Sequence, residues 1–423
     1  MSNSKPCTPR SSLGGNDHTP TTTWWKLVCT RLPPELRKKI VMSFMKRFAR
    51  GFCGGIVLYS FFRIITALLK NPFRESLPKI VDGILSTDSV KVATFLGLYP
   101  SLYHLLVELL TAIRRNNDGW TYGAAGGIAG LSAAVLNKSN RQTLAFFTLA
   151  RALGAIVSTL VTRGVLVAIP FFEVAIFSLC TSIILYCVAL KPDFLNPGYY
   201  KSILKWSRDY TDENLSILFR MPAKHFLTCQ DAGLHQGNCT QQRLNDLIKS
   251  LPGFAKLYLP IHMTPVIVFK RKVLFERPFF VFKSLVKNLV LSTSFLGLMV
   301  TLAKLTICLL RNYSHQPPPL AAHIPMLAGA ICGLALLLEH DKRRKELCLF
   351  VIPHTINILY IAISRSSFRF LFKVPNGFTF LFALSMMSIM HSYEREPESL
   401  TLLVNGLLKI FVGPRKNIQK MGK

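Results

Sequence analysis

Three residues of the types that bind metals lie close together in the polar middle of the chain: Cys229, His235 and Cys239. Thiolates and imidazoles are the ligands that zinc prefers in proteins, so these side chains are candidate metal ligands. The Cys-x5-His-x3-Cys spacing departs from the common zinc patterns and supplies only three ligands, with His225 nearby. We therefore expect no cofactor and a loop-ordering role for these residues, with zinc binding as the alternative.

Ionisable residues inside apolar stretches form a second group of candidates. An unpaired charge in hydrocarbon costs about 3 kcal/mol or more, so such residues usually pair with one another or serve a function. His104 and Glu108 are four residues apart and share a helix face, whereas Arg151 and Glu173 are expected to pair from neighbouring spans. Arg63 either snorkels to the membrane surface or joins this set. The group indicates a polar path or binding site, or else buried ion pairs that hold a helical bundle together.

A glycine-rich stretch is the third candidate, with Gly123, Gly126, Gly127 and Gly130 forming two overlaid Gly-x-x-x-Gly spacings. Glycines at this spacing give a helix a flat face on which a second helix can pack closely in lipid. The phosphate-binding patterns Gly-x-Gly-x-x-Gly after a strand and Gly-Lys-Ser/Thr do not occur here. We also find no Gly-x-Ser-x-Gly elbow and no His-Glu-x-x-His, so we expect helix packing and no catalytic residues.

The composition indicates that a membrane must surround these residues. Of the 423 residues, 50% are hydrophobic and 17% are charged, whereas a soluble domain carries about 25% charged residues. The formal net charge is +30, and basic groups such as Arg114-Arg115 and Lys270-Arg271-Lys272 lie at the ends of apolar stretches, where phospholipid headgroups are met. Membrane lipids are therefore the expected partners, and nucleic acid is not.

Changes in polarity divide the chain into successive segments. We predict a disordered polar tail at 1–23, a basic amphipathic helix at 24–50, a first membrane bundle at 51–204, a polar Cys/His-containing connecting segment at 205–253, a second membrane bundle at 254–411 and a basic tail at 412–423. The polar stretch from Lys191 to Gly253 reads as a long loop. The predicted fold class is all-α, a polytopic integral membrane protein of two helical bundles with four to five spans each.

The two bundles are related by internal repetition. Asn71-Pro72-Phe73 matches Arg277-Pro278-Phe279 at an offset of 206 residues, and Gly130-Leu131 matches Gly333-Leu334 at an offset of 203. Offsets that stay constant within blocks indicate true repetition, because chance similarity between apolar segments does not keep register across loops. Five spans per half would invert the halves in the membrane, whereas four spans and a surface helix would leave them parallel. Both arrangements are compatible with the sequence.

Several stretches resemble the transmembrane protein 135 family. These are Phe48-Ala49-Arg50-Gly51-Phe52, Arg114-Arg115 to Asp118-Gly119-Trp120, Ala125 to Ser132, Tyr199-Tyr200-Lys201, Cys229, His235 and Cys239, Tyr258-Leu259-Pro260 and Lys270-Arg271-Lys272. The first half is also similar to the wider Tim-type translocase and peroxisomal membrane protein superfamily. The chain departs from the family in having Gln236 rather than proline after His235. The glycine-rich half comes first, an order that resembles fungal members.

The resemblance implies a multi-pass protein of a peroxisomal or mitochondrial membrane that is linked to fatty-acid handling. We accordingly expect a non-enzymatic protein that supports lipid, fatty-acid or metabolite handling and organelle organisation, partnered by lipids and by itself or other organelle-membrane proteins. A translocase or channel subunit is one alternative, for which the glycine-rich helix would be an assembly seam. A lipid-modifying membrane enzyme is the other.

Overall fold

The structure, a computed structural model, describes residues 34–70, 86–116, 118–269, 275–366 and 374–414. Within these ranges the chain forms helices and no strand, which confirms the all-α prediction. Five helices are long and apolar enough to cross a membrane: α4 (Thr87–Arg114), α6 (Lys138–Thr162), α7 (Phe172–Leu190), α12 (Pro278–Ser314) and α14 (Asp341–Arg365). The chain is thus consistent with a polytopic membrane protein. The predicted tail at 1–23 and most of the one at 412–423 lie outside the described residues.

The remaining helices lie before, between and after these five. They are α2 (Pro34–Lys70), α5 (Gly119–Gly130) with the 3-10 helix η1 (Leu131–Val135), η2 (Pro192–Phe194), α8 (Pro197–Ser207), α9 (Asp212–Phe219), α10 (Cys239–Phe269), α13 (His323–Gly333) with η3 (Leu334–Leu338), α15 (Gly377–Arg395), η5 (Pro397–Ser399) and α16 (Leu402–Phe411). The expectation of a long loop from Lys191 to Gly253 is wrong, because α8, α9 and the start of α10 occupy much of it. From Pro34 on, the predicted basic helix and the apolar stretch after it form one helix, α2.

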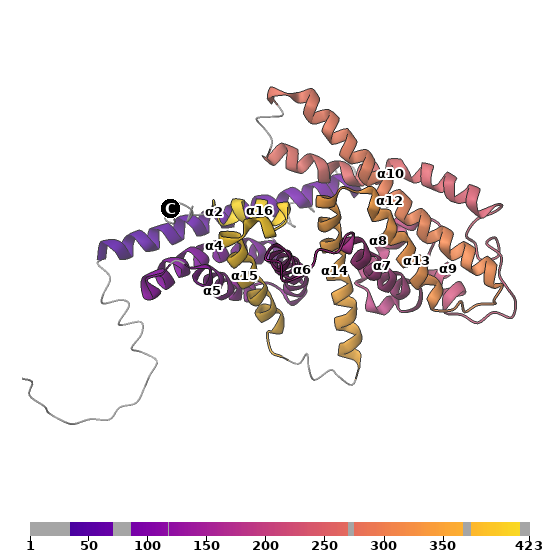
Figure 1. Ribbon diagram of the computed structural model, residues 1–423, viewed down its shortest axis with the longest axis horizontal. Helices are drawn as coiled ribbons and strands as arrows, with labels where there is room; N and C mark the ends of the chain where they lie inside the picture. The colour runs from indigo at the N-terminus through magenta and orange to yellow at the C-terminus, as the bar shows by residue number, and fades with distance from the viewer. Residues whose placement is uncertain (1–33, 71–85, 117, 270–274, 367–373, 415–423) are drawn as a thin grey trace, which may run out of the picture.

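Helices from the two halves of the sequence pack against each other. Helix α5 contacts α15, α7 contacts α13, and α6 contacts α14. In Figure 1, α6 and α14 lie between a group that contains α5 and α15 and a group that contains α7 and α13. The long helices α10 and α12 pack together and extend beyond the rest of the molecule. The three-dimensional pairs therefore join helices that lie far apart in the sequence.

The contacts between residues give the direction in which paired helices run. Gln142 lies near the start of α6, and Asn357 lies in the later part of α14. Gln142 Nε2 donates to Asn357 Oδ1 at 2.8 Å. Further along α6, the rings of Phe147 and Phe350 are 5.9 Å apart, and Gly154 lies against Leu349. Residue numbers rise along α6 as they fall along α14, so these two helices are antiparallel.

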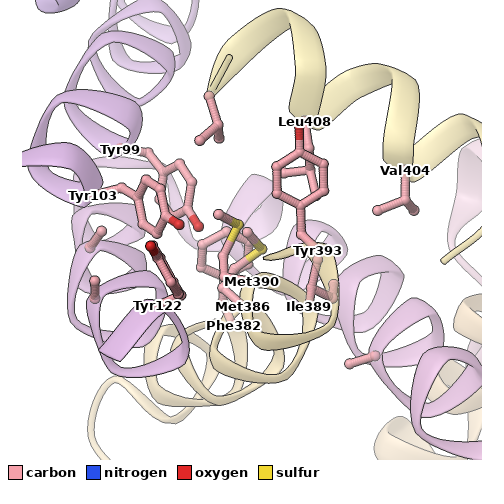
Figure 2. Close-up of a cluster of buried hydrophobic side chains, with 14 of the residues drawn as sticks. Tyr99, Tyr103, Tyr122, Phe382, Met386, Ile389, Met390, Tyr393, Val404 and Leu408 are labelled. Carbon is pink, nitrogen blue, oxygen red and sulfur yellow. The ribbon is translucent and has the colours of Figure 1, made fainter. Parts of the chain in front are cut away.

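The largest buried cluster fills the space between α4, α5, α15 and α16. Figure 2 shows Tyr99, Tyr103 and Tyr122 from one side facing Met390 and Tyr393 from the other. Leu408 and Val404 of α16 cover this cluster from outside. Because α15 and α16 lie near the end of the chain, burial of these side chains ties the C-terminal helices to the first half of the sequence.

Candidate metal centre and intramembrane interface

Four candidate metal ligands converge beside the C-terminal part of α12: Cys229, His235, Cys239 and Cys308. We call these four residues the Cys/His cluster. One ligand atom from each lies within 4.8 Å of the corresponding atom of every other member. The structure thus brings together the three candidates predicted from the sequence, and it adds Cys308, rather than His225, as the fourth residue.

A tight turn between α9 and α10 presents two members of the Cys/His cluster. The Asp231 carboxylate accepts hydrogen bonds from the Thr228 amide at 2.9 Å and from its hydroxyl at 2.6 Å. The Leu234 amide donates to the Cys229 carbonyl at 2.9 Å, and Gly233 has φ +66°, a conformation that glycine adopts without strain. Hydrogen bonds within the segment therefore fix its direction without using the Cys229 thiol.

Three nitrogen donors point at the sulfur atoms of the Cys/His cluster. Arg311 Nη2 donates to Cys229 Sγ at 2.5 Å, and Asn312 Nδ2 donates to Cys239 Sγ at 3.6 Å. Arg243 Nη2 lies 3.9 Å from Cys308 Sγ. Hydrogen-bond donors and positive charge around sulfur favour the thiolate, which is the form that binds metals.

A group of four charged residues lies next to the Cys/His cluster. Arg243 Nη1 contacts Asp209 at 2.6 Å and Asp246 at 3.0 Å, and Lys304 Nζ contacts the same two carboxylates at 3.0 and 3.5 Å. Both cations are nearly inaccessible to solvent. Two positive and two negative charges balance within this group, so it neutralises no further charge nearby.

The surroundings alter the acid–base properties of the two cluster residues in the turn. Burial, with the neighbouring Cys308 thiol, raises the pKa of Cys229 to about 12. Burial and the charge of Arg243 lower the pKa of His235, so its ring is neutral near pH 7. A neutral imidazole with a free ring nitrogen is the form in which histidine ligates metals.

The expected ion pair between Arg151 and Glu173 is wrong. Glu173 Oε1 lies 3.8 Å from Lys345 Nζ at the start of α14. Arg151 Nη1 instead donates to the Phe147 carbonyl of its own helix at 3.2 Å, and its guanidinium lies 5.8 Å from the Phe147 ring. The prediction of this ion pair rests on proximity in sequence. In the structure α7 packs against α14, so Glu173 lies beside Lys345 of α14.

The other predicted intramembrane residues make separate contacts. His104 Nε2 is 2.6 Å from the carbonyl oxygen of Val412, which follows α16. Glu108, one turn further along α4, lies 3.8 Å from Arg47 of α2. Arg63 belongs to α2, and its side chain lies outside the described residues. His104 and Glu108 therefore connect α4 to two different neighbouring elements.

The glycine-rich helix α5 lies directly against α15. A Cβ atom on Gly126 would be 2.5 Å from Met390 Cγ, and one on Gly130 would be 2.8 Å from the Ala383 Cα. A Cβ atom on Gly123 would be 3.1 Å from the Met387 carbonyl oxygen, and one on Gly127 would be 3.2 Å from Met387 Cβ. All four glycines thus allow close approach of two backbones, as Gly-x-x-x-Gly spacings do in membranes.

The contact between α6 and α14 contains a cation and an imidazole near the middles of both helices. Arg151 of α6 lies over Phe147, and His354 of α14 packs edge to face on the same ring at 5.7 Å between centroids. His354 also stacks on Tyr199 at 3.9 Å. Among the described residues, Arg151 makes no ion pair within 4 Å with a carboxylate.

Sequence reasoning misses Cys308, Arg311 and Glu339. Cys308 reads as a small apolar residue because it lies within an apolar run. Arg311, three residues later on the same helix face, is the signal that marks this part of α12 as polar. Glu339 is buried beside Arg343 at 3.3 Å, but in the sequence it lies among charged residues at the end of a predicted span and does not stand out.

No protein-family model, curated protein or solved structure matches this chain.

Proposed function

We propose that the chain consists of two repeats that lie inverted with respect to each other in the membrane. The bounds of the helices support the repeat. Helices η1 and α6 begin at residues 131 and 138, and η3 and α14 begin at 334 and 341, so both pairs of starts are 203 residues apart. The ends at 135 and 162 recur at 338 and 365 with the same offset. Such agreement across loops is the mark of a duplicated unit.

The contact between α6 and α14, which would be corresponding helices of the two repeats, supports the inverted orientation. They lie side by side and antiparallel, with Phe147 against Phe350, two residues that are themselves 203 positions apart. Both helices are long and apolar enough to span a membrane. Equivalent spans that run in opposite directions are the property of inverted-topology repeats, which recur in secondary transporters.

The function that this arrangement supports best is non-enzymatic handling of a lipid, fatty acid or metabolite within an organelle membrane. Transporters with inverted repeats bind substrate at the repeat interface, beside short or interrupted helices in corresponding positions. Here α5 with η1 and α13 with η3 are the interrupted helices. Arg151 and His354, again 203 positions apart, lie at the interface. The antiparallel contact of α6 and α14 is the observation that carries the proposal.

The substrate class that suits this interface is a molecule with an anionic group and an apolar part. Arg151 supplies a positive charge beside aromatic rings, and Phe147 and Phe350 supply the apolar surface. A peroxisomal or mitochondrial membrane is proposed from the family resemblance, which also favours fatty-acid handling.

Purification in mild detergent, followed by mass spectrometry of bound lipids and acids, tests this proposal. We expect an anionic amphipathic molecule to co-purify with the wild type and to be depleted in Arg151→Gln. Arg163→Gln is the matched control, since Arg163 lies at the end of the same helix and pairs with Glu396. Equal ligand content in the wild type and Arg151→Gln would contradict the proposal, and release of product from a bound lipid would indicate an enzyme instead.

A further inference from the structure

Two distances between ligand atoms of the Cys/His cluster are close to those in a tetrahedral metal site, and all four atoms lie within 4.8 Å of one another. Cys229 Sγ and Cys239 Sγ are 3.6 Å apart, and Cys308 Sγ is 3.9 Å from His235 Nε2. Zinc bonds of about 2.3 Å to sulfur and about 2.0 Å to nitrogen place neighbouring ligand atoms about 3.6 to 3.8 Å apart. A disulfide would need its sulfur atoms about 2.05 Å apart. The observed distances therefore suit two ligands of one ion and not two bonded sulfurs.

The charge on Arg311 gives a second, independent indication of a ligand. This side chain is 1% exposed, and its contacts are Cys229 Sγ, Asn312 Oδ1 and the Phe226 ring. Its Nε and Nη1 have no hydrogen-bond partner, and within the described residues it pairs with no carboxylate. Burying a cation without a counter-charge is costly. With neutral thiols the site would hold an uncompensated charge.

We propose that the Cys/His cluster binds one zinc ion through three thiolates and one imidazole. On binding, each of the three thiols loses its proton to solvent, and Zn²⁺ with three thiolates carries one net negative charge. Arg311 balances that charge, because it donates to Cys229 and has no carboxylate partner among the described residues. Sulfur ligands exclude calcium and magnesium, which require oxygen. This inference does not depend on the proposed transport function.

Zinc at this place has a structural role. Four protein ligands fill a tetrahedral zinc ion, whereas catalytic zinc keeps one position open for water or substrate. The ion would join the turn after α9, the first residue of α10 and the end of α12. The connecting segment between the two halves of the chain would thereby be attached to the long apolar helix α12. The neighbouring charged group of Arg243, Lys304, Asp209 and Asp246 already orders α10 at this place.

Metal analysis of the full-length protein, purified in detergent under reducing conditions without chelator, tests the inference. We expect about one zinc ion per chain in the wild type, as the four-ligand set requires. Cys308→Ser should lose the zinc, and Cys348→Ser should retain it, because Cys348 is a buried cysteine of α14 outside the cluster. Wild-type protein without zinc, even after incubation with excess zinc and dialysis, would overturn the inference. Zinc retained by Cys308→Ser would also overturn it.

Two further measurements test the site without removing any of its four ligands. Wild-type protein loaded with Co²⁺ should show intense tetrahedral d–d absorption and sulfur-to-cobalt charge transfer, and a weak octahedral spectrum would refute thiolate coordination. Arg311→Met keeps all four ligands but removes the balancing charge, so zinc affinity should fall about 10- to 100-fold. Arg311→Lys should recover part of that loss. Equal zinc affinity in Arg311→Met and the wild type would contradict the charge argument.

Discussion

Replacing Gly329 by alanine tests the close contact between α13 and α7. A Cβ atom at this position would lie 2.5 Å from the Cα of Ser182 and 2.5 Å from the Thr181 carbonyl oxygen. Both neighbours are backbone atoms, which cannot rotate away as a side chain can. Since carbon atoms pack at about 3.5 to 4.0 Å, the two helices would have to separate by about 1 Å. Overpacking of this kind costs about 1–3 kcal/mol.

The control is Gly54→Ala within α2, where an added Cβ atom would have no neighbour within 4 Å. Alanine favours a helix over glycine by about 1 kcal/mol, so this variant should be slightly more stable. Thermal unfolding in detergent, followed by loss of the monodisperse peak, should show a lower midpoint for Gly329→Ala and an equal or higher one for Gly54→Ala. A Gly329→Ala protein as stable as the control would refute the close packing of these helices.

Three other changes have defined outcomes. Ser182→Ala removes a hydroxyl that donates to the Met326 carbonyl of α13 at 2.8 Å. We expect the free energy of unfolding to fall by about 0.6 kcal/mol. An unchanged unfolding midpoint would argue against this hydrogen bond. Glu339→Leu removes the carboxylate that lies 3.3 Å from Arg343. The free energy of unfolding, measured with denaturant, should fall by about 3 kcal/mol. A variant with wild-type stability would contradict this prediction. The hydrogen bond from Arg163 lowers the pKa of Glu396 in the folded protein. A carboxyl group with a lowered pKa stabilises the folded state above the pKa that the group has in the unfolded chain. This stabilisation is lost as the pH falls through the pKa that the group has in the folded protein. Arg163→Gln should therefore lose less stability than the wild type between about pH 5 and pH 3, and identical acid unfolding curves would exclude this contribution.

The membrane class and most helices can be predicted from the sequence because both depend on local patterns. Apolar length and basic ends identify α4, α6, α7, α12 and α14 without any knowledge of their partners. The polar stretch after α7 reads as a loop because its residues are hydrophilic, yet a helix that is amphipathic needs only one apolar face. Helix α10, for example, begins at Cys239 in this stretch and buries Phe254.

The partners of individual residues cannot be predicted in the same way because they depend on which helices pack together. Glu173 lies closest in sequence to the span of Arg151, but the packing of α7 on α14 brings it to Lys345. Cys308 is 69 residues beyond Cys239, so no motif search joins them. Only the packing of α10 on α12 brings the two cysteines together. Long-range pairing of this kind leaves no local pattern in the sequence.

Side-specific labelling of two engineered cysteines tests the inverted arrangement most directly. Lys138 and Asp341 are exposed first residues of the corresponding helices α6 and α14. Single Lys138→Cys and Asp341→Cys variants, made in a background with Cys7, Cys29 and Cys53 replaced by serine that serves as control, would be treated with a membrane-impermeant maleimide in sealed vesicles. Inverted repeats predict that one variant is labelled in intact vesicles and the other only after permeabilisation. Labelling of both from the same side would contradict the account.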